Sequence, residues 1–294
     1  MDLFLQTAIN GLLIGGVFAA FSLGFQLAFG VLHVVDFAVG GWVMLGGYAG
    51  YWGSTLLGVD PFLLLPATFA LFAATGYLLG PLVYRVRATR YARPALMTLA
   101  FTFGLFLVMR GGALTFWGFD TRAVSTVASG ENIRIGPVVV PLLRLIAFLF
   151  AAALALGLFA VLYRTRLGLA IRATAQSREY AGLMGVDVKR LSALVYALYT
   201  GLTGVAGVLM AAIYSVTPET GLRYTLFAFF VAVLAGLGSV GGVLAAALFL
   251  GVLEAMVAVY VGSSYSHLVV FGTLYLVLLL SPQGILRRGA IAES

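Results

Sequence analysis

The chain has 294 residues, of which 62% are hydrophobic and 9% charged, and its mean hydropathy is +1.09. Because about a quarter of the residues in a soluble domain are charged, this composition excludes an ordinary soluble fold and indicates a surface that faces lipid. The net charge of +7 does not indicate a nucleic-acid partner. The basic residues, all arginine apart from Lys189, lie mainly between apolar runs and act there as topology signals. The absence of cysteine excludes a disulfide framework and a Cys-based metal or redox site.

A series of apolar runs predicts an all-α polytopic membrane protein. At roughly 20 residues per crossing, we expect about eight to nine transmembrane helices in one membrane domain over residues 1–294. The first run lacks the basic start of a secretory signal, so we expect it to remain as a span. The long block from Tyr224 to Val261 exceeds one crossing, and we divide it at the glycines between 236 and 242. The expected spans are Leu3–Val31, Phe37–Leu57, Phe62–Val83, Ala95–Trp117, Val138–Tyr163, Ser192–Tyr214, a short helix over 224–235, Gly241–Val261 and His267–Leu280.

Arginine-rich gaps set the expected orientation. Such gaps favour the cytoplasmic side, whereas the gaps at 118–137 and 214–223 carry little net charge and are placed outside. All basic gaps fit one topology only if the short helix after Tyr224 crosses fully and the N-terminus lies outside. A re-entrant helix would place the basic tail outside, so we expect the full crossing. The residues concerned are Arg85, Arg87, Arg90 and Arg93, then Arg164, Arg166, Arg172, Arg178, Lys189 and Arg190, and finally Arg287 and Arg288.

The 37 glycines recur at helical spacing, which is typical of closely packed membrane helices. The cluster from Gly236 to Gly242, which includes Gly238, is different because it interrupts an apolar block. A broken helix there would expose backbone groups to a cavity.

The basic segment at 164–191 contains a predicted short helix, from Ala173 to Met184. Its residues favour helix, and Gly185 stands at a plausible C′ position that would end it. A rigid polar helix between two spans could transmit the push of a soluble partner. The alternative is an ordinary solvated basic loop.

This segment carries a resemblance to a known family. Glu179, Ala181 and Gly185 match the spacing of the E-A-A-x-x-x-G loop by which permeases of ABC importers engage their ATPase subunits, with Tyr180 in place of the middle alanine. The chain as a whole resembles the permease subunits of branched-chain amino acid importers. The resemblance implies an ABC permease fold in which residues 164–191 form the coupling loop, with Arg172 and Asp187 beside the motif. The other matching stretches are Asn10–Gly15, Leu23–Gly30, Phe37–Tyr48, Gly236–Gly241 and Pro282–Leu286.

The start of the second span departs from that family. The amino acid branch typically reads N-F-A-H-G-E, whereas this chain reads Asp36-Phe37-Ala38-Val39-Gly40-Gly41. The stretch from Asp36 to Gly40 also resembles the D-L-S-V-G of related sugar permeases. The departure leaves the solute open while the transporter class stands.

The resemblance implies a set of partners in a bacterial or archaeal inner membrane. These are a second permease, identical or paralogous, two ATP-binding cassette subunits, and a periplasmic or lipid-anchored solute-binding protein. The chain cannot supply the ATPase, because a phosphate-binding P-loop needs G-x-x-x-x-G-K-[ST] and Lys189 stands between Val188 and Arg190. We therefore expect no cofactor on this chain and ATP use by the partners.

Charged residues at membrane depth are candidates for the solute path, because each is costly there unless paired or hydrated. Glu254 lies deep in its expected span and should face a cavity or a partner helix. Arg110 either lines the path or extends toward the outer interface. Asp36 is either the N-cap of the second helix or, with His33, borders the path. The full candidate set is His33, Asp36, Gly40, Arg110, Gly236, Gly238 and Glu254.

These observations favour a non-catalytic translocation subunit that moves branched-chain amino acids or a similar small polar solute. A sugar, nucleoside, urea or amide is the alternative solute. An ion-coupled secondary transporter is a second hypothesis, but it needs several intramembrane ion ligands and an inverted repeat. A membrane-embedded enzyme ranks last, since two histidines and no close carboxylate pair offer no catalytic cluster.

Overall fold

The computed structural model describes residues 2–88, 94–135 and 138–280. Arg90, Arg93, Arg287, Arg288 and the Pro282–Leu286 motif lie outside the described residues. Within these ranges six helices are long and apolar enough to cross a membrane. The chain is therefore a predominantly helical, multi-pass membrane protein.

The elements follow one another along the chain as a nearly continuous series of helices. α9, with 16 residues, falls short of the roughly 17–25 residues of a crossing. The bounds are α1 Asp2–Leu32, α2 Val39–Leu57, a 3₁₀ turn Pro61–Leu64, α3 Leu65–Ala88, α4 Pro94–Trp117, β1 Asn132–Ile135, β2 Val138–Pro141, α5 Leu142–Arg164, α6 Arg166–Gln176, α7 Arg178–Leu183, α8 Val188–Ile213, α9 Thr220–Ala235, α10 Val240–Val257, a π turn Ala258–Gly262 and α11 Ser263–Leu280.

A β-hairpin corrects the expectation of an entirely helical chain. β1 and β2 pair antiparallel, with Ile133 opposite Val140. The expected span from Val138 is wrong at its start, because α5 begins only at Leu142. Three consecutive valines, β-branched and suited to a strand, precede Pro141, which occupies the N-cap position of α5.

The centre of the bundle is formed by α1 and α8, which are almost entirely buried, whereas only 22% of the residues in the apolar stretches of α3, α4 and α5 are buried. α8 packs against α1, α2 and α3, and α1 also packs against α10. Glycines bring the backbones together. A side chain at Gly46 would collide with the Gly204 carbonyl on α8, and one at Gly251 on α10 would collide with Gly11 and Gly15 on α1.

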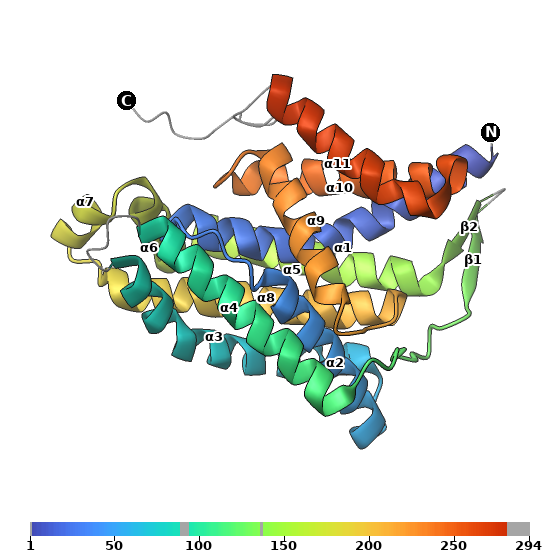
Figure 1. Ribbon diagram of the computed structural model, residues 1–294, viewed down its shortest axis with the longest axis horizontal. Helices are drawn as coiled ribbons and strands as arrows, with labels where there is room; N and C mark the ends of the chain where they lie inside the picture. The colour runs from blue at the N-terminus through green and yellow to red at the C-terminus, as the bar shows by residue number, and fades with distance from the viewer. Residues whose placement is uncertain (1, 89–93, 136–137, 281–294) are drawn as a thin grey trace.

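Different elements form the two ends of the molecule (Figure 1). α6 and α7 lie at one end of the long axis, and the hairpin and the N-terminus lie at the other. The last turn of α3, with Arg85 and Arg87, reaches the end that carries α6 and α7. The described basic segments therefore share one end, as the predicted orientation requires.

α9 is short for a membrane crossing. Its 16 residues extend about 24 Å at 1.5 Å per residue, less than the roughly 30 Å of a hydrocarbon core. The helix ends at Gly236, where the backbone has φ of +85°. The full crossing after Tyr224 stays a prediction.

We predict that Gly46→Val disrupts the α2–α8 contact. The added carbons would meet backbone rather than a flexible side chain, and overpacking of this kind costs about 1–3 kcal/mol. The melting temperature and the monodisperse yield in detergent should both fall. Gly104→Val on α4 is the matched control, because a Cβ at Gly104 meets nothing within 4 Å. Equal melting temperatures for the two variants would contradict the packing described here.

Candidate functional site

The segment from 165 to 190 is built from three helix starts, each capped by a side chain. Thr165 accepts from the Gly168 amide at 3.0 Å, Ser177 from the Tyr180 amide at 3.4 Å, and Asp187 from the Arg190 amide at 3.0 Å. Each cap satisfies a backbone donor that a helix start leaves free. The expected single helix over Ala173–Met184 is wrong, because the extended backbone of Ser177 divides it into α6 and α7.

Gly185 ends α7 as the sequence predicts. Its φ of +88° lies in the left-handed region, which glycine adopts without a steric penalty. The Gly185 amide donates to the Gly182 carbonyl and the Val186 amide donates to the Ala181 carbonyl, both at 3.0 Å. This pair of bonds forms a Schellman motif, with Gly185 at C′.

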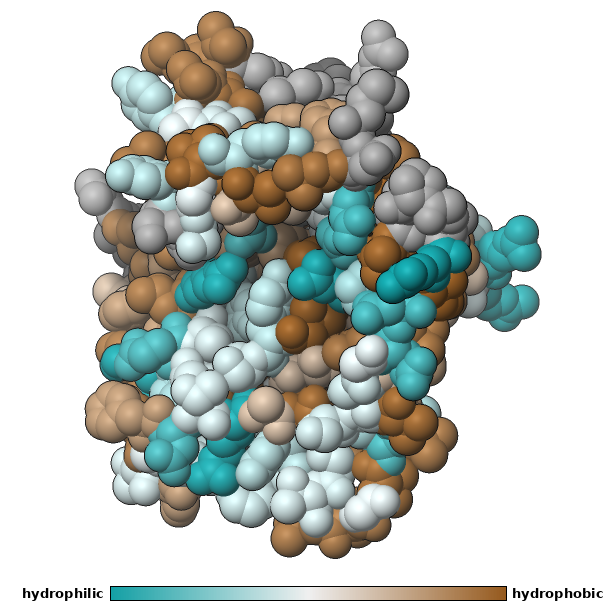
Figure 2. All heavy atoms as spheres, turned by 90° about the vertical axis from the view of Figure 1, so that its right-hand side faces the viewer, coloured by the Kyte–Doolittle hydropathy of each residue, from teal (hydrophilic) through white to brown (hydrophobic). Residues whose placement is uncertain are grey.

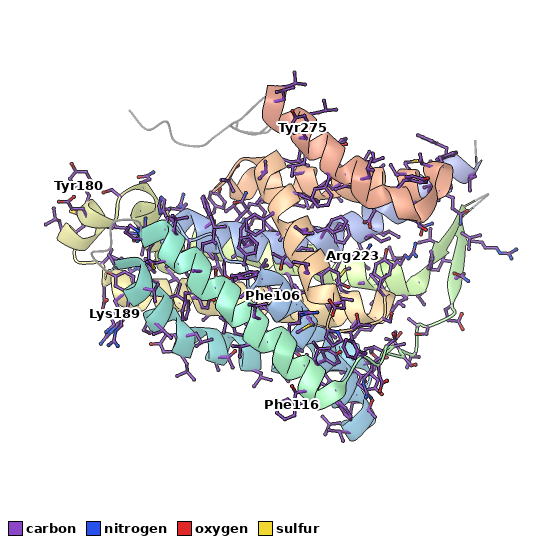
Figure 3. The ribbon with its side chains drawn as sticks, viewed as in Figure 1. Phe106, Phe116, Tyr180, Lys189, Arg223 and Tyr275 are labelled. Carbon is purple, nitrogen blue, oxygen red and sulfur yellow. The ribbon has the colours of Figure 1, made fainter. Side chains whose placement is uncertain are left out.

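α7 exposes apolar side chains at one end of the long axis of the molecule. Tyr180, Leu183 and Met184 are 71%, 77% and 86% exposed, whereas Ala181 is buried. Figure 3 shows Tyr180 at the far end of the long axis, on the same side as Lys189. We call Tyr180, Leu183 and Met184 the α7 tip. The candidate Glu179 is also exposed beside it.

The other candidates of this segment support its local structure. The Arg172 guanidinium lies 5.0 Å from the centre of the Tyr163 ring, in cation–π contact with the end of α5. Asp187 caps α8 and also pairs with Arg190 at 3.2 Å. Sequence reasoning missed Arg178, whose Nε and Nη2 donate to the Val31 carbonyl on α1 at 3.2 and 2.7 Å.

The connection between α1 and α2 is organised by Asp36, whose side chain is fully buried. Its Oδ1 accepts from the Ala38 amide at 2.7 Å, and its Oδ2 accepts from the Tyr196 hydroxyl on α8 at 2.8 Å. Asp36 stands two residues before the observed N-cap, Ala38, so the N-cap expectation is wrong in register. His33 is exposed and has φ of +50° just after the end of α1.

Gly40 lies in a tight contact between α2 and α9. Its amide donates to Thr225 Oγ1 at 3.1 Å, and a Cβ would collide with the Gly221 carbonyl. The neighbouring Phe37 carbonyl accepts from the same Thr225 hydroxyl at 3.2 Å. The structure thus places Asp36 and Gly40 together at the meeting of α2, α8 and α9.

Gln26 secures the break between α9 and α10, and sequence reasoning missed it. The side chain is fully buried in α1. Its Nε2 donates to the carbonyls of Ala232 and Gly236 at 3.2 and 2.9 Å, and its Oε1 accepts from the Gly238 amide at 2.8 Å. The broken helix at Gly236 and Gly238 therefore directs its backbone groups to a side chain of α1. A glutamine deep in an apolar run was the available signal.

The charged candidates Arg110 and Glu254 each pair with α9 or its N-cap. Arg110 forms an ion pair with the exposed Glu219. Glu254, 8% exposed, pairs with Arg223 at 2.7 Å, and the Arg223 guanidinium also lies over the rings of Tyr214 and Phe227. Glu254 faces a partner helix, one of the two expected surroundings. Arg223 was missed because it was assigned to a loop.

These pairs lie away from α7. Figure 3 shows Arg223 in the half of the molecule toward the hairpin. In the view onto that end, polar residues gather over the middle of the face and apolar residues lie along its edges (Figure 2). The structure thus brings Asp36 and Gly40 together at the start of α2, whereas the break at Gly236 follows the far end of α9.

Comparison with known proteins gives one consistent family. The family described as "Branched-chain amino acid transport system / permease component" matches residues 7–278. The chain is 31% identical to the high-affinity branched-chain amino acid transport system permease protein BraD of Pseudomonas aeruginosa, over 99% of this chain and 98% of that protein. It is 32% identical to the permease protein LivH of Salmonella typhimurium, over 99% and 97%. A probable LivH of Methanocaldococcus jannaschii is 25% identical over 87% and 80%. No solved structure matches.

We predict that Tyr196→Phe destabilises the protein by about 1–3 kcal/mol, because it removes a hydrogen bond to a buried carboxylate. The shift in detergent melting temperature measures the loss. The same loss should be much smaller in an Asp36→Asn background, since the two residues share one hydrogen bond. Tyr163→Phe, at an exposed tyrosine, is the control. Additive shifts of Tyr196→Phe and Asp36→Asn would rule out the coupling.

Proposed function

The chain belongs to the family of branched-chain amino acid transport permease components, and we propose that it is the translocation subunit of an ATP-driven importer of branched-chain amino acids. The relatives named above are permease subunits of such importers and match nearly the whole chain. Permease subunits are transport components rather than catalysts. The structural observation that carries the proposal is α7, a capped helix that presents apolar side chains which the bundle leaves exposed.

The α7 tip is proposed as the contact for an ATP-binding cassette subunit. Exposed apolar residues at a water-facing end mark an interaction surface, and the tip stands at the end that carries the basic residues. Glu179 and Gly185 belong to the same element, the first exposed at its start and the second fixing its end. Residues 164–191 are thereby the coupling loop of a single permease domain, 1–294.

The solute path is proposed to run beside α9, the helix that most of the path candidates contact. Gly40 lies in the contact between α2 and α9, and Asp36 stands just before α2. Gly236 and Gly238 follow the end of α9. Arg110 and Glu254 form ion pairs at its start. A small zwitterion suits such a path, because opposite charges already occur there in pairs and few fixed charges remain to trap it. His33 is the exposed member of the set nearest the coupling end.

The assembly follows from the family. We infer a second permease, identical or paralogous, two ATPase subunits that use ATP, and a periplasmic or lipid-anchored binding protein, in a bacterial or archaeal inner membrane. The orientation rule supports nine crossings with the N-terminus outside, in which α2 and α9 are short spans. An ion-coupled mechanism is disfavoured, since the deep acid Glu254 is bound to Arg223.

The function is tested with the complex isolated from its host membrane through a tag on this chain and reconstituted with its binding protein. Leucine uptake should require ATP, and excess isoleucine or valine should compete. Competition by a sugar, a nucleoside, urea or an amide but not by these amino acids would identify another solute. Uptake that follows an ion gradient without ATP would reject the importer.

We predict that Leu183→Ser with Met184→Ser lowers the amount of ATPase that copurifies with the permease. The loss of two exposed apolar contacts should weaken the complex about tenfold or more, equal to ~1.4 kcal/mol or more. Quantitative blotting after tag purification measures it. Leu169→Ser, at an exposed leucine of α6, is the matched control. ATPase recovery at the level of the wild type would remove the proposed contact.

We further predict that Gly185→Ala weakens coupling while Gly182→Ala does not. A Cβ at either glycine meets nothing within 4 Å, and only Gly185 has a positive φ. The substitution at Gly185 therefore adds about 1–2 kcal/mol of backbone strain, whereas Gly182 lies within the helix. Leucine uptake per ATP hydrolysed should fall for Gly185→Ala alone. Equal values for the two variants would show that the end of α7 is not critical.

A further inference from the structure

The coupling loop is fastened to the central helix α1 by one side chain. Arg178, the first residue of α7, donates from both Nε and Nη2 to the Val31 carbonyl. Val31 is buried and lies one residue before the end of α1. The last four carbonyls of a helix lack intrahelical partners, and a cation is favoured beside them. Arg178 therefore supplies a charged cap to α1 from a different element.

The surroundings of Arg178 make this bond more than a surface contact. The guanidinium is half-buried, and burial lowers its pKa from the ordinary value, with the positive charge of Arg87 adding to the effect. Arginine nevertheless stays charged in proteins. The bond is thus charge-assisted and shielded, and such bonds are about twice as strong as neutral ones.

The bond closes a ring of contacts around the end of the bundle. From Val31 the chain turns at His33 and reaches Asp36, whose carboxylate binds the Tyr196 hydroxyl of α8. Tyr196 lies about two turns into α8, and α8 begins three residues after Gly185, which ends α7. The ring therefore runs from α7 through Arg178 to α1, on to Asp36 and Tyr196, and back along α8 to α7.

Without Arg178, α7 would be joined to the bundle mainly by backbone. Ser177 on one side is extended, and Gly185 on the other is left-handed with open space around it. A helix of six residues between two such joints, with Ala181 as its buried side chain, keeps some freedom to tilt. The bond to Val31 removes that freedom at the N-terminal end of α7.

We propose that Arg178 is the positioning residue through which a movement of α7 reaches the α1–α2 connection and its Asp36–Tyr196 contact. The inference rests on the proposed importer function and adds to it the route by which the coupling loop acts on the bundle. A displacement of α7 must either carry the end of α1 with it or break a shielded charged bond. The Asp36–Tyr196 contact lies next along the same chain.

The test uses the complete reconstituted complex with Arg178→Ala, Arg178→Lys and the control Arg85→Ala, an exposed arginine in the last turn of α3 and outside the coupling loop. Leucine uptake, basal ATP hydrolysis and ATPase copurification are measured on each. For Arg178→Ala we expect normal copurification and basal hydrolysis but about tenfold less uptake per ATP hydrolysed. Arg178→Lys should recover part of the loss, because one ammonium can replace one of two hydrogen bonds. Arg85→Ala should behave as the wild type.

The remaining outcomes decide against the proposal. Unchanged uptake per ATP in Arg178→Ala overturns it, and so does a parallel loss of copurification, which would make Arg178 a docking residue. An equal effect of Arg85→Ala would indicate a general charge requirement. If the complex with Arg178→Ala does not assemble, the lysine variant decides. Full coupling with lysine would overturn the proposal that the two hydrogen bonds of Arg178 transmit the movement of α7. A wild-type complex without ATP-dependent uptake would instead defeat the importer function itself.

Discussion

The close approach of helix backbones at glycine is the constraint on which the rest of the structure depends. Apolar side chains give no preference for a neighbouring helix over lipid, so membrane helices associate through close packing and polar contacts. Here α2 meets α8 at Gly46, α1 meets α10 at Gly251, and α2 meets α9 at Gly40. These contacts set how closely the helices approach one another. They thereby position the polar side chains that link the helices.

The buried and deep polar groups act as links between elements. Gln26 joins α1 to the break after α9, Asp36 joins the α1–α2 connection to α8, and Glu254 joins α10 to α9. In each case two groups that would be costly alone in the membrane satisfy one another. The same pairing explains why the depth of a charge alone does not mark the solute path: Glu254 is deep because Arg223 faces it.

The sequence predicts the features that depend on local chemistry. Most helical spans, the helix stop at Gly185 and the shared end of the described basic segments all follow from composition, from backbone preference or from the charge rule. The features it did not predict depend on which elements meet in space. The division at Ser177, the role of Gln26 and the bond from Arg178 to α1 each involve a partner distant along the chain. The hairpin at β2 is the exception, because its run of valines was a local signal hidden by a general expectation of helix.

The distribution of tight and open joints indicates where the molecule can change shape. Helices that touch backbone to backbone, as at Gly40 and Gly46, cannot slide without steric conflict, so α2 must move together with α8 and α9. Two of the joints with open space are Gly185, where no atom lies within 4 Å of a Cβ, and Gly238, where only Gly30 lies nearby. One stands at the coupling end and the other follows α9. Because α1 is bonded near the first through Val31 and at the second through Gln26, a displacement of α1 acts on both joints at once. A single central helix thus links the coupling loop to the helix beside which we place the path.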